Sequence, residues 1–122
     1  MLCFHLHALG ANPWLSPFAA LPIQEEGLQF KSAADWLACR QAQRRGDLQK
    51  AEKHLRGDIL PRDEDVADAP QDDLEKALTM MAVQHPLTVL VPLVATLKFK
   101  LECAECPKLA RAWENIRDRT ST

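Results

Sequence analysis

Two groups of residues have the side chains of a metal or redox site. The chain carries one C-x-x-C motif, Cys103-Ala104-Glu105-Cys106, and two histidines two positions apart, His5 and His7. A structural zinc site needs four ligands, so Cys3, Cys39 or the histidines would have to fold back onto the motif. A redox motif begins a helix after a strand, whereas we place this one at a helix end. We therefore predict ordinary thiols, no metal and no cofactor, with zinc binding and redox chemistry as the alternatives.

The sequence contains none of the common nucleophile or phosphate-binding motifs, and its clearest cluster of basic residues also contains acidic residues. No sequence of the G-x-S-x-G, P-loop or G-x-G-x-x-G type occurs. Six basic residues lie close together in the chain: Arg40, Arg44, Arg45, Lys50, Lys53 and Arg56. Because Asp47, Glu52 and Asp58 lie among them, we predict a solvated helix surface, with phosphate binding as the alternative. His54 and His85 have no nearby nucleophile or carboxylate signature.

Composition and charge limit the class of protein. The 122 residues are 47% hydrophobic and 26% charged, which suits one ordinary core and not a disordered chain. A formal net charge of −2 provides no overall positive field, so we do not expect nucleic acid or an anionic membrane as a partner. The longest apolar run, 86–97, is shorter than the ~20 residues of a membrane-spanning helix. No basic residue precedes the apolar residues near Met1, so we predict no signal peptide and a single cytoplasmic domain over 1–122.

Periodicity predicts a mainly helical α+β domain with a small β element near the amino terminus. Hydrophobic residues alternate over 2–8 and favour a strand, and 28–30 favours a second short strand after a turn at 25–27. Cap residues bound the next two helices, in chain order Ser32 with Asp35 as a capping box, then Gly46, Asp47 and Gly57.

The second half of the chain is expected to be helical after one long loop. Residues 58–71 are acidic, contain two prolines and lack periodicity, so they form that loop. Asp72 or Asp73 caps a helix that His85-Pro86 interrupts. The strongest apolar stripe predicts a helix that Pro92 kinks or begins, and its members are Leu90, Leu93, Val94, Leu97 and Leu101. Pro107 opens the last helix.

One stretch of the chain resembles a known family. The matching residues are Trp14-Leu15-Ser16-Pro17-Phe18, Pro22, Gly27, Phe30-Lys31-Ser32, Trp36, Arg40, Ala42 and Gly46-Asp47. They resemble the NADAR (YbiA-like) N-glycosidase superfamily, whose pattern reads approximately L-S-N-F, then P, D-G-x-x-F-x-S-x-E-x-Y, a basic residue before K-A, and G-D before a helix. Leu97-Lys98-Phe99 looks like the family's later K-F element. The match covers roughly a third of the chain closely and the remainder loosely.

The resemblance implies cleavage of an N-glycosidic bond between a ribose phosphate or ADP-ribose and a base or amine. Such a reaction needs a carboxylate for the oxocarbenium-like centre, aromatic walls for a planar base and cations for phosphate. On this reading Trp14, Phe18 and Trp36 supply the walls, and Arg40 and Lys98 face the phosphate. The family's cleft also implies that 14–18 packs near 32–40 and 97–99.

The chain departs from the family at the residues that matter for the reaction. The family's glutamate falls on Ala34 and its asparagine on Pro17, and the tryptophan and methionine block before the K-F element has no counterpart. Asp35 is adjacent to the lost carboxylate, but one helical step rotates a side chain by about 100°. The capping box also explains Asp35 fully, so its catalytic role competes with a structural one.

Three functions remain open at this stage. We expect first a diverged domain that binds a nucleotide, ADP-ribose or ribose phosphate, with weak or lost N-glycosidase activity. The alternative from another class is a non-enzymatic, protein-binding adaptor or inhibitor of phage or bacterial origin, which the acidic stretch 63–65 and the missing glutamate permit. The third is an active glycosidase with a relocated carboxylate at Asp35, Glu25 or Glu26.

Overall fold

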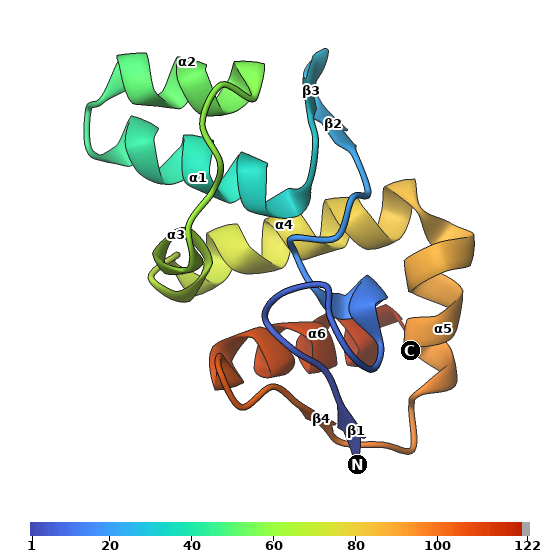
Figure 1. Cartoon of the computed structure of the whole chain (residues 1–122). Coiled ribbons are helices and arrows are strands. Elements are labelled where there is room, and N and C mark those ends of the chain that lie inside the picture. Colours follow the sequence, from blue (N-terminus) through green and yellow to red (C-terminus); the bar gives the residue numbers. More distant parts are fainter. Residues whose placement is uncertain (121–122) are drawn as a thin grey trace.

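Helices stack on one another through most of the structure, a computed structural model that describes residues 1–120. Helix α4 (Gln71–Gln84) lies between α1 (Ala33–Arg44) on one side and α6 (Pro107–Thr120) on the other, and α2 (Leu48–Arg56) packs on the outer side of α1 (Figure 1). Helix α4 is covered on both sides, and its inward residues are wholly buried: Leu74, Ala77, Leu78 and Met81. The α+β, mainly helical class predicted from the sequence is confirmed.

The cap residues predicted for α1 and α2 are where the sequence places them. The Ser32 hydroxyl accepts a hydrogen bond from the Asp35 N–H, and the Asp47 carboxylate accepts one from the Lys50 N–H. Gly46 and Gly57 have φ of +79° and +76°, the left-handed backbone that ends a helix at low cost only with glycine. These caps fix α1 and α2 as an antiparallel pair.

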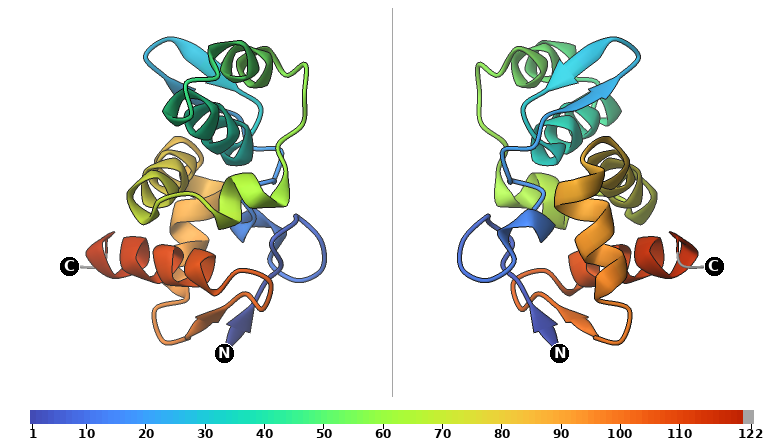
Figure 2. Two further views of the ribbon diagram at one scale, coloured as in Figure 1. Left: turned by 90° about the vertical axis from the view of Figure 1, so that its left-hand side faces the viewer. Right: turned by 90° about the vertical axis from the view of Figure 1, so that its right-hand side faces the viewer.

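The β structure is small and lies at two ends of the molecule. Strands β2 (Ile23–Glu25) and β3 (Leu28–Phe30) form an antiparallel hairpin, so the expected turn at 25–27 begins one residue late. Strand β1 (Leu2–Cys3) pairs in parallel with β4 (Leu101–Glu102). Figure 2 shows the hairpin beside α1 and α2, and the β1–β4 pair at the far end beside α6.

The predicted strand over 2–8 is wrong in its length. The alternation itself is real, because Phe4 and Leu6 are buried while His5 and His7 are exposed. The ladder nevertheless stops after Cys3, because β4 offers only two residues for pairing. Beyond Cys3 the alternating segment is irregular backbone that still packs its apolar side chains inward.

The predicted boundaries in the second half need three corrections. The segment 58–71 holds a short helix, α3 (Asp63–Ala67), and α4 starts at Gln71 after Pro70 and not at an aspartate cap. The expected helix over 90–101 is a π-helical turn, η2 (Pro86–Leu90), followed by α5 (Val91–Ala95). The helix ends there because the chain turns at Thr96 and brings Leu101 into the sheet with β1.

One hydrophobic cluster joins both ends of the chain. The indole N–H of Trp113 in α6 donates to the Leu15 carbonyl at 2.7 Å, at the end of the 3-10 turn η1 (Pro13–Leu15). Within residues 1–120 no single helix has the length and apolar composition of a membrane span. Two consecutive helical segments, 71–84 and 86–95, have that length and composition only when they are taken together, and they meet at a bend of 107°.

Candidate functional site

A pocket of about 340 Å³ opens where the amino-terminal segment, the start of α1 and the chain after α2 meet. We call it the Phe18 pocket. Eight residues line it: His7, Phe18, Ala20, Lys31, Ser32, Asp35, Leu60 and Pro61. The wall combines an aromatic surface, one lysine, one carboxylate, one hydroxyl and three apolar side chains. This is the mixture of apolar lining and few polar groups that small-molecule sites have.

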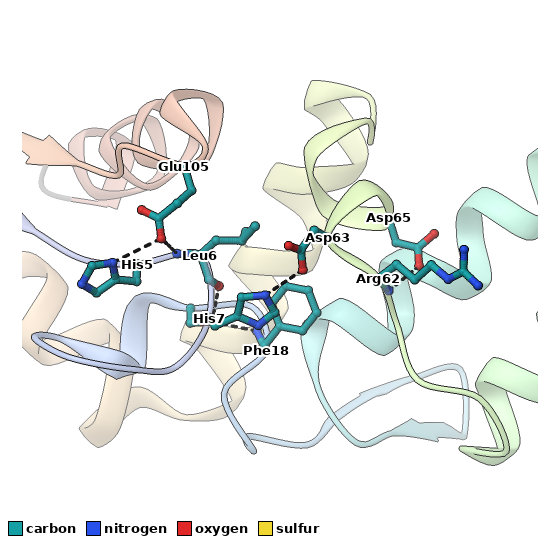
Figure 3. Close-up of polar contacts among 9 residues, drawn as sticks. His5, Leu6, His7, Phe18, Arg62, Asp63, Asp65 and Glu105 are labelled. Carbon is teal, nitrogen blue, oxygen red and sulfur yellow. Dashed lines mark hydrogen bonds and ion pairs between the residues drawn. The ribbon is translucent and has the colours of Figure 1, made fainter.

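The aromatic wall is made by a stacked pair. The rings of His7 and Phe18 lie 4.5 Å apart between centroids, with planes inclined by 29°. The position of His7 is fixed from its other side, since its Nε2 lies 2.7 Å from Oδ1 of Asp63 at the start of α3 (Figure 3). The acidic stretch that the sequence assigned to a loop therefore holds one wall of the pocket in place.

The carboxylate of Asp35 reaches the pocket, but it already has a partner. The Ser32 hydroxyl donates to Asp35 Oδ2 at 2.7 Å and accepts from the Asp35 N–H at 3.2 Å, and both side chains are buried. The predicted capping pair thus forms, with one difference. The carboxylate bonds the Ser32 hydroxyl, whereas a complete capping box bonds the backbone N–H of the cap residue.

Lys31 supplies the cation of the pocket. A Cβ atom built on Gly57 would lie 2.8 Å from both Cε and Nζ of Lys31, so the end of the lysine side chain rests on the carboxyl end of α2. The partial negative charge at a helix carboxyl terminus attracts an ammonium group. Lys31 makes no ion pair with another side chain in the described part of the chain, and its charge is available to a ligand.

Trp36 and Arg40 lie on a different face of α1 from Asp35. The Trp36 indole donates to Glu25 Oε1 at 2.9 Å, and Lys76 lies 2.7 Å from the other carboxylate oxygen of Glu25. Hydrogen bonds from Lys76 and Trp36 hold the pKa of Glu25 below its usual range. Arg40 is 3.9 Å from Asp73, which α4 contributes. These contacts connect α1 to β2 and α4, so neither residue lines the Phe18 pocket.

The other predicted ligand residues are also elsewhere. Trp14 is half-buried against the hydrophobic core, and Lys98 is exposed in the turn between α5 and β4. The expected packing of 14–18 against α1 is present, because the Ala34 N–H donates to the Pro17 carbonyl at 2.9 Å. The segment 97–99 instead lies against α6, where Arg117 donates to the Phe99 carbonyl at 2.7 Å. Of the five predicted ligand residues, the pocket contains Phe18 alone.

Ala34 is wholly buried and is not part of the pocket wall. It occupies the position where the resembling family has its glutamate. A carboxylate introduced at this position would lie in the core beside the Pro17 carbonyl, without a partner. The pocket therefore has only the capped carboxylate of Asp35 for charge stabilisation.

Five of the lining residues were not predicted from the sequence, and these are His7, Ala20, Lys31, Leu60 and Pro61. The order Lys31-Ser32 places a cation directly before a helix cap, and that signal was available in the sequence. The contribution of 60–61 was not available, because it depends on how the chain turns back after α2.

The C-x-x-C motif lies between β4 and α6, at a helix start and not at a helix end as predicted. Burial raises the pKa of the Cys103 thiol, which favours the unreactive protonated form. His5 is 3.2 Å from Glu105 and bonds to that carboxylate (Figure 3). Within residues 1–120 no three His, Cys, Asp or Glu side chains are grouped as metal ligands.

Comparison of the chain with protein-family models, with curated proteins and with solved structures found no match. The geometry of the Phe18 pocket is therefore the basis on which a function can be proposed.

Proposed function

We propose that the protein binds a nucleotide, ADP-ribose or a ribose phosphate in the Phe18 pocket, with weak or no N-glycosidase activity. One observation carries the proposal: a stacked aromatic wall and a lysine that forms no ion pair among residues 1–120 line the same pocket. A planar base stacks favourably on an aromatic ring, and an ammonium group binds phosphate as a point charge.

The rim of the pocket supports a ligand with apolar surface. Leu60 is 82% exposed, and it lines the same pocket as Pro61 and the aromatic pair. A ligand that stacks on Phe18 would cover Leu60 and remove its side chain from water. Burial of apolar surface contributes about 25 cal/mol per Å² before the cost of ordering the ligand is subtracted.

We expect slow or absent turnover because, among residues 1–120, the pocket has no free carboxylate beside the expected position of the sugar. Glycosidic bond cleavage needs a negative group beside the developing positive charge at the sugar. Asp35 is engaged by the Ser32 hydroxyl, and Ala34 has no side-chain charge. Loss of one preorganised electrostatic group typically lowers the rate by roughly 10²–10³. Ligand binding does not depend on that group, so binding persists without efficient chemistry.

The test is titration calorimetry with ADP-ribose and ribose 5-phosphate on wild-type protein and three variants. We expect micromolar to millimolar affinity, weakened at least about tenfold by Lys31→Gln and by Phe18→Leu. Lys98→Gln removes an exposed lysine outside the pocket and serves as the matched control, with unchanged affinity. Base release, followed by chromatography, is expected to stay near background.

Two results would contradict the proposal. One is equal weakening by Lys31→Gln and Lys98→Gln, which indicates general electrostatics and no site. The other is absence of binding to every phosphorylated ribose compound together with specific capture of a protein partner, which favours the adaptor.

A further inference from the structure

One buried histidine has no well-formed hydrogen bond in the described part of the chain. His54 lies in the last turn of α2 and is only 2% exposed. Neither Nδ1 nor Nε2 has a partner at normal hydrogen-bond distance and angle within residues 1–120, and only the Ile59 backbone carbonyl lies close enough to interact weakly with the ring. Buried polar side chains are nearly always paired, because an unpaired donor or acceptor loses its hydration without compensation. An unpaired imidazole in the wall of a pocket therefore indicates a bound partner.

His54 lines a second pocket, of about 300 Å³, which we call the His54 pocket. Its other lining residues are Lys50, Ile59, Leu60, Arg62 and Asp65. Leu60 belongs to both pockets, so the two are neighbours.

The polar groups of the His54 pocket are mostly cationic and unengaged. The side chains of Lys50 and Arg62 make no hydrogen bond or ion pair among residues 1–120. The single carboxylate, Asp65, accepts the Arg62 backbone N–H at 2.7 Å through Oδ2 (Figure 3). One hydrogen bond from the backbone thus partly compensates the negative charge of Asp65. Among residues 1–120, the two positive charges have no acceptor and the imidazole N–H has none at normal hydrogen-bond geometry.

We propose that the His54 pocket is an oxyanion site that binds phosphate, either as the free ion or as the phosphate group of a larger ligand. Lys50 and Arg62 supply the charge, and the imidazole N–H of His54 donates to a phosphate oxygen. Phosphate offers several acceptors in different directions, which matches three donors on two structural segments. The inference does not depend on the ligand of the Phe18 pocket, because the phosphate ion alone is expected to bind.

Binding of phosphate is expected to be linked to protonation of His54. Burial lowers the pKa of the imidazole, while Asp65 from α3 and Asp35 from α1 oppose that effect. Lys50 on the same helix lowers the pKa further, and the Ile59 carbonyl raises it. A phosphate in the pocket adds negative charge beside the ring, so it raises the pKa of His54.

The experiment follows the histidine side chains by long-range ¹H–¹⁵N spectra during titration with inorganic phosphate, at several pH values and constant ionic strength. His54→Gln identifies the His54 signals. We expect saturable shifts of His54, a raised pKa of its imidazole, and apparent affinity weakened at least about tenfold by Lys50→Gln and by Arg62→Gln. Lys53→Gln, an exposed lysine of α2 outside the pocket, is the matched control and leaves the titration unchanged.

The proposal is overturned if chloride at the same ionic strength shifts His54 equally, or if Lys53→Gln weakens the response as much as Lys50→Gln. A second titration separates the two sources of phosphate. Competition of ADP-ribose with phosphate assigns the pocket to a larger ligand, and simultaneous binding assigns it to the free ion; both outcomes support the site. ADP-ribose binding together with no response of His54 to inorganic phosphate refutes this inference alone, and a phosphate response without ADP-ribose binding refutes only the function proposed above.

Discussion

The roles of Ser32 and Asp35 can be separated by replacing each of them. Asp35→Asn keeps the shape of the side chain and an oxygen that still accepts from the Ser32 hydroxyl at the start of α1. It removes only the charge of a charge-assisted hydrogen bond, which is about twice as strong as a neutral one. We therefore expect a loss of about 0.5–1 kcal/mol in the free energy of unfolding.

Ser32→Ala is expected to cost more, because it removes two interactions. The Asp35 N–H loses its acceptor, which as a helix cap contributes about 1 kcal/mol. The buried carboxylate loses its donor, which adds about 1–2 kcal/mol. The expected total is about 2–3 kcal/mol. The double variant should cost less than the sum of the single variants, since Asp35→Asn removes the charge that Ser32→Ala leaves unpaired.

The measurement is urea unfolding followed by fluorescence and circular dichroism, with base release assayed on the same samples. A capping role predicts that Ser32→Ala destabilises more than Asp35→Asn and that neither changes the background rate of base release. A catalytic role of Asp35 predicts instead that Asp35→Asn lowers the rate of base release and has little effect on stability. If Asp35→Asn abolishes robust wild-type glycosidase activity while the free energy of unfolding stays unchanged, Asp35 is a catalytic carboxylate and our reasoning is wrong.

Three further predictions concern a buried carboxylate, a buried histidine and two glycines with positive φ. Asp73 is held by Arg44 through two hydrogen bonds of 2.6 and 2.8 Å, which lower the pKa of its carboxyl group. Asp73→Asn should therefore cost about 2 kcal/mol at neutral pH, and less as the pH falls through the folded-state pKa, in urea unfolding at several pH values. Burial lowers the pKa of His54 below the unfolded value of about 6.5, so the unfolded chain binds more protons. Stability should be complete above about pH 6.5 and decrease as the pH falls below it, and His54→Gln should flatten that part of the profile. Gly57→Ala and Gly46→Ala place alanine at nearly the same positive φ and should each cost about 1 kcal/mol in thermal unfolding. Only the Cβ at Gly57 meets Lys31, so only Gly57→Ala should weaken ADP-ribose binding; equal weakening by both variants would contradict the placement of Lys31.

Much of the fold could be predicted where a local rule dominates. Ser32, Gly46, Asp47 and Gly57 act as caps because each needs only its own neighbours in the chain to satisfy a helix end. The predicted boundaries are wrong where contacts with a distant segment of the chain determine the local structure. The stripe 90–101 has helical spacing throughout, yet its end leaves the helix because Leu101 pairs with Leu2 across almost the whole chain.

In the candidate site, too, some residues belong to local sequence patterns, whereas others are brought together only by distant segments of the chain. The sequence alone can indicate only the first group. Phe18 and Asp35 belong to local patterns, the Trp14–Phe18 stretch and the α1 cap, and the Ala34–Pro17 hydrogen bond brings these segments together at the pocket. Trp36 and Arg40 lie outside the pocket. A motif gives an order of residues and not a direction, and one step along α1 turns a side chain toward Glu25 and α4. His54 lacked a signal of its own in the sequence. Its environment arises only when α3 and the chain after α2 fold against it, and these place Arg62 and Asp65 around an imidazole that Lys50 already flanks. Long-range packing thus creates the two features that carry the proposals. Among residues 1–120 these are a lysine without an ion pair in the same pocket as stacked rings, and a buried histidine without a well-formed hydrogen bond in a pocket with two cations.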